Sequence, residues 1–408
     1  MIKSIGMRPI PGVRVTVISN DVVAPYSGML PGYIAGHYTR DECHIDLMHL
    51  SAFANVRFIE ARAVGLDLAT RRIHLAGRPS IAFDAASLNV GISPDSQIPG
   101  VAAHTTPIKP IGQLLDRIDH VLRVASSIST PTSSSDGSSA TRHRCVVVGG
   151  GAGGVEVALA LQHRLGPRGE TSLVTRGRLL RDFPDSVRIS ALRSLVSAGV
   201  VVHEHAPVTS VSPQRLMVDD GRTEIDFDTC LWCTEASAPT WLSQVGCNTT
   251  KDGFIAIRDT LQSTTHPYLF AVGDCATSVD YPRPKAGVFA VRQGPPLAEN
   301  LRRYFADIPL KPFKPQSTYL SLISLGRKSC IAAWGPFSFV GDFLWRWKDR
   351  IDRAFMRKFS DDLRFDQTPS MIKEVNLDKD SMPVMRCNGC GSKISASALS
   401  TALARARA

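Results

Sequence analysis

The chain has 408 residues, of which 43% are hydrophobic and 21% charged, a globular composition that suits roughly two or three ordinary domains. Lysine and arginine number 47 against 37 aspartates and glutamates, a surplus compatible with nucleic acid, an anionic membrane surface or anionic cofactors. Nine cysteines are too sparse for a disulfide-stapled miniprotein, and no apolar stretch reaches the roughly 18 residues of a membrane-spanning helix. The N-terminus has no signal-peptide pattern, so we expect a cytoplasmic protein.

The first third of the chain alternates short predicted strands with turns. Residues 13–19 alternate apolar and polar side chains, which predicts a strand, and the proline- and glycine-rich residues 25–32 predict a turn. Further predicted elements are strands at residues 56–67, 72–75 and 86–90 and an amphipathic helix at residues 114–124.

A new unit is expected after a serine-rich segment. Residues 126–139 read SSISTPTSSSDGSS, a composition that buries little apolar surface and predicts a flexible insertion. Apolar strands then alternate with helices, which predicts a parallel sheet. The expected elements are strands at residues 144–148, 171–175 and 200–203 and helices at residues 155–164 and 187–198.

Residues 149–154 read GGGAGG and match the G-x-G-x-x-G pattern between a predicted strand and a predicted helix. In that context Gly149 permits a tight turn, Gly151 lets the backbone approach a pyrophosphate, and Gly154 lets helix and strand pack closely. The helix N-terminus then supplies free N–H groups to the phosphates. We predict a dinucleotide-binding turn rather than a purely structural one, with Glu156, just inside the helix, as a further candidate.

The next predicted strand ends at Val174-Thr175-Arg176, about 20 residues beyond the glycine turn, where a carboxylate usually binds the ribose of NAD. No carboxylate stands at this position. Arg176 is therefore either a ligand of the 2′-phosphate of NADP or a solvated surface arginine, and both interpretations stay open.

A second candidate cofactor segment is Tyr268-Leu-Phe-Ala-Val-Gly273-Asp274, an apolar strand that ends in a glycine and a carboxylate. Ligands of open α/β sheets lie at such carboxyl ends. The segment resembles the second flavin motif of the pyridine nucleotide-disulfide oxidoreductase superfamily. The resemblance implies that Asp274, with Gly273, binds the ribityl chain of FAD. Residues 229–242 resemble the loop that returns from the nucleotide domain, although Glu235 stands in place of the family's glycine.

The resemblance is closer to type II NADH dehydrogenases, on residues 25–36, 284–301 and 319–359, and more narrowly to the oxidoreductase domain fused to selenide, water dikinase. It implies that hydride passes from NAD(P)H to FAD and that electrons pass on to a quinone-like or other small molecule. No C-x-x-C follows the opening strand, so no dithiol relay is expected. Lys285 and Gln293 are the candidates for residues beside the flavin ring, with an ordinary surface lysine as the alternative for Lys285.

The resemblance implies an α/β fold of two Rossmann-like dinucleotide-binding domains, for FAD and NAD(P), with an added C-terminal α+β segment. Residues 1–11 match only the end of the family's first helix, so we expect the first strand and glycine turn of the flavin domain to be lacking and flavin binding to be weak. The expected parts are a discontinuous flavin domain at 1–110 and 255–310, a linker at 111–143, an NAD(P)-binding domain at 144–254, a C-terminal region with a basic helix at 311–375, and the truncated start of a dikinase-like domain at 376–408.

Two C-x-x-C pairs end at Cys233 and Cys390. We predict no metal site, because residues three apart in the apolar strand of the first pair point to opposite faces. The second pair lies in a segment that resembles the opening of selenide, water dikinase, and the resemblance matches Cys390 and Lys393 to its reactive cysteine and lysine. The body of that enzyme is not in the sequence, so no dikinase activity is expected.

Residues 341–359 combine aromatic and basic side chains at helical spacing. The apolar residues that recur every four positions are Phe343, Trp347, Ile351, Phe355 and Phe359. Such a helix either packs on the protein's own core or makes a peripheral membrane contact, apolar face inward and basic side toward anionic headgroups. The resemblance to type II NADH dehydrogenases implies a comparable role, because those enzymes use a similar C-terminal region to reach membrane quinone. Nucleic acid is not an expected partner, because no recognition motif accompanies the charge.

The leading hypothesis is therefore a FAD-dependent NAD(P)H oxidoreductase. One alternative is a degenerate nucleotide-binding or regulatory module without turnover. Another is a fragment of a bifunctional selenophosphate-synthesis protein that acts through Cys387 and Cys390. The electron acceptor and the choice between NADH and NADPH stay open.

Overall fold

The structure, a computed structural model, describes residues 1–92, 97–109, 111–127, 142–234, 237–360 and 363. The chain divides into one compact unit, Met1–Leu363, and a second, Arg364–Ala408, which lies outside the described residues. Most of the serine-rich segment, Glu235 and the dikinase-like residues also lie outside them.

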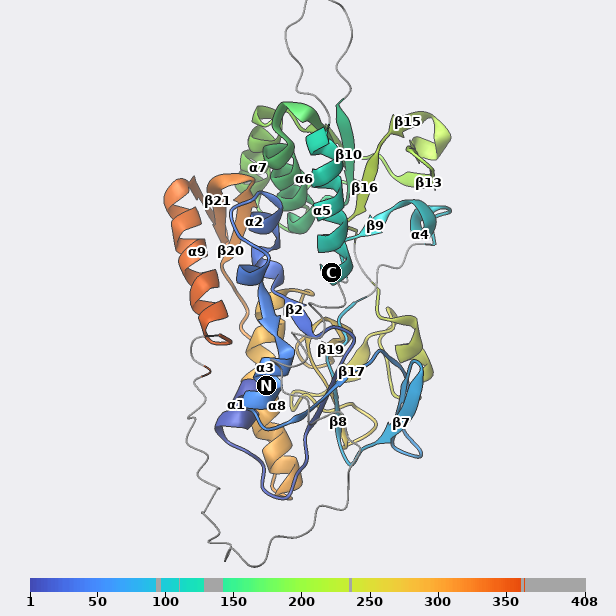
Figure 1. Ribbon diagram of the computed structural model, residues 1–408, viewed down its shortest axis with the longest axis vertical. Coiled ribbons are helices and arrows are strands. Elements are labelled where there is room, and N and C mark those ends of the chain that lie inside the picture. Colours follow the sequence, from blue (N-terminus) through green and yellow to red (C-terminus); the bar gives the residue numbers. More distant parts are fainter. Residues whose placement is uncertain (93–96, 110, 128–141, 235–236, 361–362, 364–408) are drawn as a thin grey trace, which may run out of the picture. The chain divides into compact units, whose positions relative to one another are not determined.

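The glycine turn belongs to a parallel α/β arrangement (Figure 1). Its five-stranded sheet has the order β12-β11-β10-β16-β9, and all neighbouring strands run parallel. The strands are β9 (Thr106–Pro107), β10 (His143–Val148), β11 (Gly169–Val174), β12 (Val201–His203) and β16 (Thr229–Trp232). The helices are α4 (Val101–His104), α5 (Ile111–Ser127), α6 (Ala152–Leu165) and α7 (Asp185–Ser197), with η3 at Gly166–Arg168. The strand and helix alternation in the sequence therefore predicts this sheet correctly.

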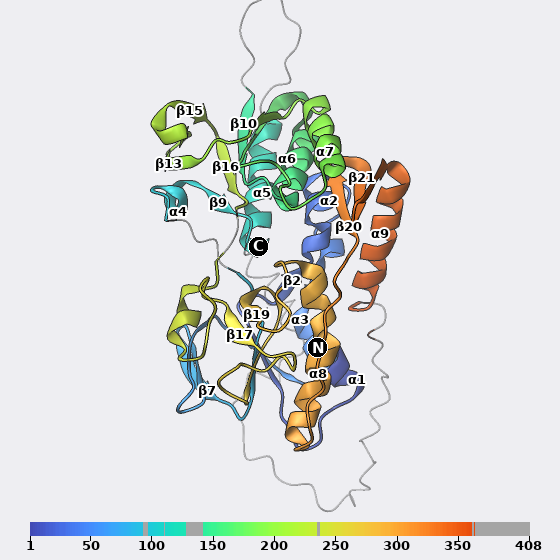
Figure 2. The same ribbon diagram turned by 180° about the vertical axis from the view of Figure 1, so that it is seen from behind.

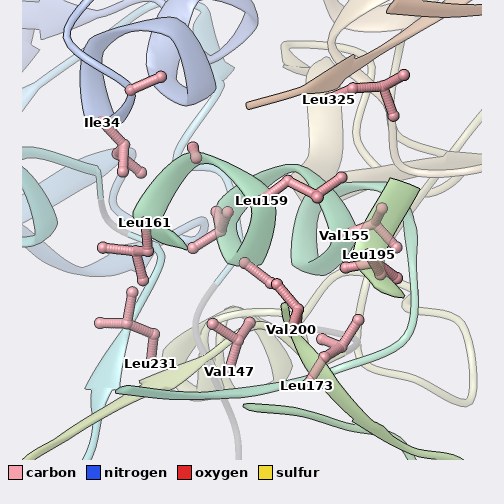
Figure 3. Packing of buried hydrophobic residues seen from close by; sticks show 14 of the residues in the cluster. Ile34, Val147, Val155, Leu159, Leu161, Leu173, Leu195, Val200, Leu231 and Leu325 are labelled. Atoms are coloured by element: carbon pink, nitrogen blue, oxygen red, sulfur yellow. The ribbon is translucent and has the colours of Figure 1, made fainter. Parts of the chain in front are cut away.

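Helix α6, which starts at the glycine turn, is buried on opposite sides. Val147, Leu173 and Leu231 of the sheet pack below it, and Ile34 and Leu325 pack above it (Figure 3). A helix enclosed in this way has apolar residues around its whole circumference. Burial of each large apolar side chain contributes about 1.5–3 kcal/mol, so this core fixes the helix whose N-terminus carries the turn.

An antiparallel sheet follows β12 in the chain. Its strands are β13 (Val208–Ser212), β14 (Arg215–Val218) and β15 (Thr223–Asp226), with η4 at Asp219–Gly221. Val211 and Leu216 of this sheet share a core with Val146 and Trp232. The hairpins therefore brace the side of the parallel sheet opposite to α6.

Gly273 lies among three parallel pairs of strands, β1–β4, β8–β18 and β17–β19, which no described strand joins to one another. The strands are β1 (Thr16–Ser19), β4 (Arg57–Glu60), β8 (Ala86–Leu88), β17 (Ile255–Ile257), β18 (Leu269–Ala271) and β19 (Ala276–Ser278). An antiparallel sheet contains β5 (Ala63–Asp67), β6 (Arg72–Leu75) and β7 (Arg78–Ala82). The helices are α1 (Ile2–Met7), α3 (Leu47–Phe53) and α8 (Gly287–Phe305), with η5 (Thr240–Gln244) and η6 (Gly273–Cys275). Helix α1 contacts both α3 and α8.

The C-terminal elements are an antiparallel sheet and the basic helix, which contacts β21 (Figure 2). They are β20 (Ser321–Leu325), β21 (Arg327–Trp334), β22 (Phe337–Gly341) and α9 (Asp342–Arg357). An N-terminal stretch packs against them, with β2 (Val23–Pro25), η1 (Ser27–Met29), α2 (Leu30–Ile34), η2 (Asp41–Cys43) and β3 (His44–Asp46). Met29 and Tyr38 of this stretch share a core with Leu344 and Trp345.

The expected turn at residues 25–32 is wrong in part, because η1 and the start of α2 lie there. Pro31 sits at the beginning of α2. The first helical turn accepts proline, whose missing N–H would have no partner there in any case.

Two stretches pack differently from what the expected domain boundaries suggest. The expected linker contains the predicted helix, which forms α5, and its apolar side packs in the same core as α6. The final residues of the stretch assigned to the NAD(P) domain pack elsewhere, since Leu242 and Phe254 share a core with Phe270 near Gly273. In both cases tertiary packing, which composition does not reveal, sets the boundary.

Of the two interpretations of the apolar stripe on α9, core packing does not describe its first three residues, which face outward, whereas Phe355 packs against Tyr26. Phe343, Trp347 and Ile351 are 63%, 47% and 42% exposed. The buried face instead contains a Lys348–Asp352 ion pair at 2.5 Å, and Lys348 Nζ also donates to the carbonyl oxygen of Gly28. None of the described helices combines the length and the hydropathy needed to cross a bilayer.

Candidate cofactor sites

The glycine turn connects β10 to α6 by close backbone contacts. Gly149 has a φ of +133°, and a Cβ there would lie 2.4 Å from the carbonyl oxygen of Cys233. A Cβ on Gly154 would lie 1.9 Å from the carbonyl oxygen of Gly149. Any side chain at these two positions would therefore displace backbone, which is the physical reason for glycine here.

Gly151 is a glycine for a different reason. It is the N-cap of α6, and a Cβ there would meet no atom within 4 Å. Protein packing does not demand glycine at this position, and open space lies in front of the helix N-terminus. Space beside free helical N–H groups is what a pyrophosphate needs, so the residues present fit a dinucleotide.

The second predicted segment forms a tight turn after β18. Gly273 has a φ of +69°, and a Cβ there would lie 2.4 Å from Asn89 Oδ1. The Gly273 N–H donates to Gln293 Oε1 at 2.6 Å. Asp274 follows in η6 with its side chain 15% exposed. Side chains from two other segments therefore hold the turn that presents the Asp274 carboxylate.

Lys109 is a site residue that no sequence motif reveals. Its Nζ donates to Asp274 Oδ2 at 2.8 Å, and the two side chains are 33% and 15% exposed. Lys109 stands two residues after β9, which pairs with β16 of the glycine-turn sheet. The one available signal is this position at the carboxyl end of a strand, and β9 is too short to be recognised from the sequence.

The segment with Lys109 brings the two turns together. The Ile108 N–H donates to the carbonyl oxygen of Trp232 at 3.1 Å, and Ile108 Cδ1 would lie 3.9 Å from a Cβ on Gly153. The next residue, Lys109, is paired with Asp274. Because neighbouring Cα atoms are about 3.8 Å apart, the start of α6 and the Asp274 carboxylate flank the same two residues.

Lys285 is half-buried and hydrogen-bonded just before α8. Its Nζ donates to the carbonyl oxygen of Ala276 at 2.5 Å and to Thr277 Oγ1 at 2.7 Å. It also lies 3.8 Å from the centroid of the Phe254 ring. Burial lowers the pKa of Lys285 to about 8, against the opposing effect of the Asp274 carboxylate.

A concavity open to solvent lies beside the Gly273 turn, and the open solvent in front of it is part of its roughly 480 Å³ of empty space. All four residues predicted for the flavin line it: Gly273, Asp274, Lys285 and Gln293. Aromatic and basic side chains complete the walls, among them Arg258, Tyr281, Arg283, Phe289 and Phe313. Polar groups for a polyhydroxyl chain and rings for a planar heterocycle therefore surround one concavity, which fits FAD.

Glu156, a candidate ligand at the glycine turn, is in contact with the C-terminal sheet instead. Its Oε1 accepts a hydrogen bond from the Ser324 N–H of β20 at 2.8 Å. Burial raises the pKa of Glu156 to about 6, although Lys348 and the Ser324 N–H favour the charged form. The contact that the structure gives Glu156 is thus with the C-terminal sheet.

Arg176 stands two residues after the end of β11, at the sheet edge where α6 begins, and its side chain is exposed. Of the first cysteine pair, Cys233 directly follows β16 at this same end, whereas Cys230 lies near the start of the strand. Burial raises the pKa of Cys230 to about 12 and raises that of Cys233 further, so neither thiol is poised as a thiolate. In the part of the chain that the structure describes, no cluster of histidine, cysteine, aspartate and glutamate could hold a metal ion.

Residues 4–294 match the family described as pyridine nucleotide-disulphide oxidoreductase. The type II NADH:quinone oxidoreductase of Haemophilus influenzae is 31% identical over 188 residues, which cover 41% of each protein. The ferroptosis suppressor protein 1 of Xenopus tropicalis is 27% identical over 302 residues, which cover 71% of this chain and 73% of that protein. The chain thus spans less than half of the Haemophilus enzyme.

Solved structures agree on the fold. The sulfide:quinone oxidoreductase of Aquifex aeolicus superposes with a TM-score of 0.70 at 14% identity, over 88% of this chain and 89% of that one. NDH2 of Plasmodium falciparum, in complex with NADH, superposes with a TM-score of 0.67 at 14% identity, over 87% and 94%. The expected two-nucleotide α/β fold is confirmed at this level.

Proposed function

Because this chain belongs to the pyridine nucleotide-disulphide oxidoreductase family, we propose that it is a FAD-dependent NAD(P)H oxidoreductase that delivers electrons to a quinone-like small molecule. Family and fold are those of flavin-dependent enzymes that use NAD(P)H. The acceptor is inferred from relatives named as an NADH:quinone oxidoreductase and a demethylphylloquinone reductase.

The single observation that carries this proposal is the closeness of the two turns. Ile108 lies beside Gly153 at the start of α6, and its neighbour Lys109 is ion-paired with Asp274 at 2.8 Å. Two nucleotide cofactors held by these turns would meet across a short segment. Such an arrangement suits electron transfer between cofactors better than two separate binding functions.

Each residue has a defined task in this proposal. Gly151 leaves room for the pyrophosphate of NAD(P)H, and the N-terminal N–H groups of α6 bind it. Asp274 accepts hydrogen bonds from the flavin's ribityl hydroxyls, and Lys109 orients its carboxylate. Gln293 fixes the Gly273 backbone, and Lys285 places a cation at the pocket wall. When bound, FAD supplies a carrier that accepts a hydride and releases electrons to the acceptor.

We also propose that residues 341–359 touch a membrane surface, where a quinone would dissolve. The support is the exposed stripe of Phe343, Trp347 and Ile351 on α9, beside the exposed Arg346 and Arg350. An apolar face with flanking basic side chains suits an anionic bilayer interface. Replacement of Phe343 and Trp347 by serine should abolish sedimentation with phosphatidylglycerol vesicles, and sedimentation equal to that of the native protein would contradict this contact.

A finer proposal concerns residues 376–408, which we take as the start of a selenide, water dikinase-like domain. Its support is the sequence Cys387-Asn-Gly-Cys390-Gly-Ser-Lys393 alone. Replacement of both cysteines by serine should leave NAD(P)H oxidation unchanged. A loss of that activity would instead tie these cysteines to the redox reaction.

The test of the main proposal is NAD(P)H oxidation by the purified chain with added FAD and a soluble short-chain quinone. We expect quinone-dependent loss of absorbance at the nicotinamide band, and FAD retained after gel filtration. Measurable nicotinamide binding without any turnover would contradict the proposal and favour the regulatory module.

A further inference from the structure

The loop after β11 lies against the glycine turn. The Leu180 N–H donates to the carbonyl oxygen of Gly150 at 2.8 Å, and a Cβ on Gly150 would lie 2.4 Å from Thr175 Oγ1. Arg176 follows Thr175 directly. Its place is therefore beside the phosphate-binding turn, at the carboxyl edge where the adenosine ribose of a dinucleotide lies.

The neighbouring strand β12 ends at the same edge and brings one carboxylate there. The Thr175 N–H donates to the carbonyl oxygen of His203 at 2.9 Å, so Glu204 is close to the end of β11. Glu204 is already engaged, because it accepts the Leu179 N–H and pairs with Arg188, both at 2.5 Å. This carboxylate is thus not free to accept the 2′-hydroxyl of NAD.

Burial alone would raise the pKa of Glu204, but the Leu179 N–H and the Arg188 guanidinium outweigh it and hold this pKa below its usual range. Glu204 therefore stays ionised in its internal pair. It neutralises Arg188 and has no contact with Arg176.

The loop itself is rich in arginine. Residues 176–188 contain four arginines and two aspartates. Arg178 pairs with Asp185, and Arg181 lies 3.7 Å from Asp182. Arg176 is exposed and has no hydrogen bond or ion pair among the residues that the structure describes. An unengaged guanidinium thus stands where the ribose would lie, with His205 also exposed at this edge.

We infer that this chain prefers NADPH to NADH, with Arg176 as the ligand of the 2′-phosphate. The inference rests on the proposed function and adds the identity of the reductant. A guanidinium donates parallel N–H groups to a phosphate, whereas the 2′-hydroxyl of NADH finds no free carboxylate at this edge. Selectivity therefore comes from one exposed side chain and from the internal pairing of Glu204.

The test uses two ligands that differ by this phosphate alone, adenosine 2′,5′-bisphosphate and adenosine 5′-monophosphate. Titration calorimetry on the full chain needs neither flavin nor turnover. We expect the bisphosphate to bind about tenfold tighter or more, as a charge-assisted phosphate contact implies. Arg176→Ala should bring the two affinities to within about threefold of each other, and Arg176→Glu should reverse the preference.

Arg168→Ala is the matched control. Arg168 lies just before β11, at the opposite end of the strand from Arg176, and its loss makes the same change in net charge. We expect this variant to keep the full preference for the bisphosphate, and all variants to unfold at the native temperature.

Three results would overturn the inference. Equal affinities in the native protein would leave the dinucleotide site intact and remove the NADPH preference. A preference that survives in Arg176→Ala would assign the phosphate to another residue. Binding of neither nucleotide would remove the proposed function together with the inference.

Discussion

At the glycine turn backbone meets backbone, since a Cβ on Gly149 or Gly154 would collide with a carbonyl oxygen. At the Gly273 turn the supports are side chains from distant segments. Gln293 holds the Gly273 N–H at 2.6 Å, and Lys109 holds Asp274 at 2.8 Å. The glycines that define the first turn lie within consecutive residues, 149–154. The contacts of the second turn form only when segments far apart in the sequence pack together. Single substitutions at the glycine turn should therefore have large effects on stability or binding, whereas those at the Gly273 turn should have smaller ones.

The largest effect is expected for Gly154→Ala. Its Cβ would lie 1.9 Å from a backbone oxygen that cannot move without opening the turn. We expect the free energy of unfolding to fall by about 3 kcal/mol, measured by urea denaturation, and nucleotide binding to be lost.

Gly153→Ala is the control for this change. A Cβ at Gly153 would approach nothing closer than Ile108 Cδ1 at 3.9 Å, and alanine favours a helix. If both variants were equally stable, backbone contact would not be what defines this turn.

The next effect concerns the carboxyl group of Glu156 on α6. The pKa of Glu156 is raised by burial from 4.5 to about 6, so the native state holds its proton more tightly than the unfolded state. As pH rises from 4.5 to 6, the native protein should lose up to about 2 kcal/mol of stability relative to Glu156→Gln, and no more above pH 6.

Denaturation curves of both proteins from pH 4 to 8 would measure this difference. Glu170→Gln, an exposed position on β11, is the control and should track the native protein at every pH. A constant difference between the native protein and Glu156→Gln across this range would mean that folding does not shift the pKa of Glu156.

A smaller effect, mainly on binding, is expected for Gly151→Ala. A Cβ there meets no protein atom within 4 Å but fills the space assigned to the pyrophosphate. Alanine is a poor N-cap, so we expect the free energy of unfolding to fall by about 0.5–1 kcal/mol, and calorimetry to show a roughly tenfold loss of NADPH affinity. Unchanged affinity would show that the pyrophosphate lies elsewhere.

The smallest effect is expected at the side-chain-built turn. Asp274→Asn keeps the shape but removes the charge that Lys109 contacts. Because Lys109 is a third exposed, the pair should contribute only about 0.5–1 kcal/mol to stability, while FAD affinity should fall several-fold.

A double-mutant cycle with Lys109→Met isolates the pair. Retained flavin after gel filtration, read from its absorbance, gives the effect on binding. If the two substitutions were strictly additive in both measurements, Lys109 would not act through Asp274.

The sequence predicts those parts of the site that follow from consecutive residues. The G-x-G-x-x-G turn and the strand ending in Gly273-Asp274 carry their geometry locally, and the family resemblance adds Lys285 and Gln293. Lys109 cannot be predicted as a site residue from the sequence, because β9 spans only two residues and pairs with a strand more than a hundred residues away.

The same limit applies to those features of the fold that tertiary packing decides. The periodicity of residues 342–357 predicts the helix but not the face that packs, because a buried ion pair takes the inner side. Likewise, the residues around Leu242 follow the NAD(P)-domain strands in sequence but join the core around Phe270, which only tertiary contacts decide.

The inner side of α9 is locked by Leu344, Trp345 and the Lys348–Asp352 pair before any lipid is present. Many amphipathic anchors are coils in water and gain helicity on vesicles, so their affinity is offset by the entropy of ordering. A preformed helix avoids that loss, and its far-ultraviolet circular dichroism should stay constant while vesicles are added. In the membrane contact proposed above, this surface would therefore bind without a change in the helix content of α9.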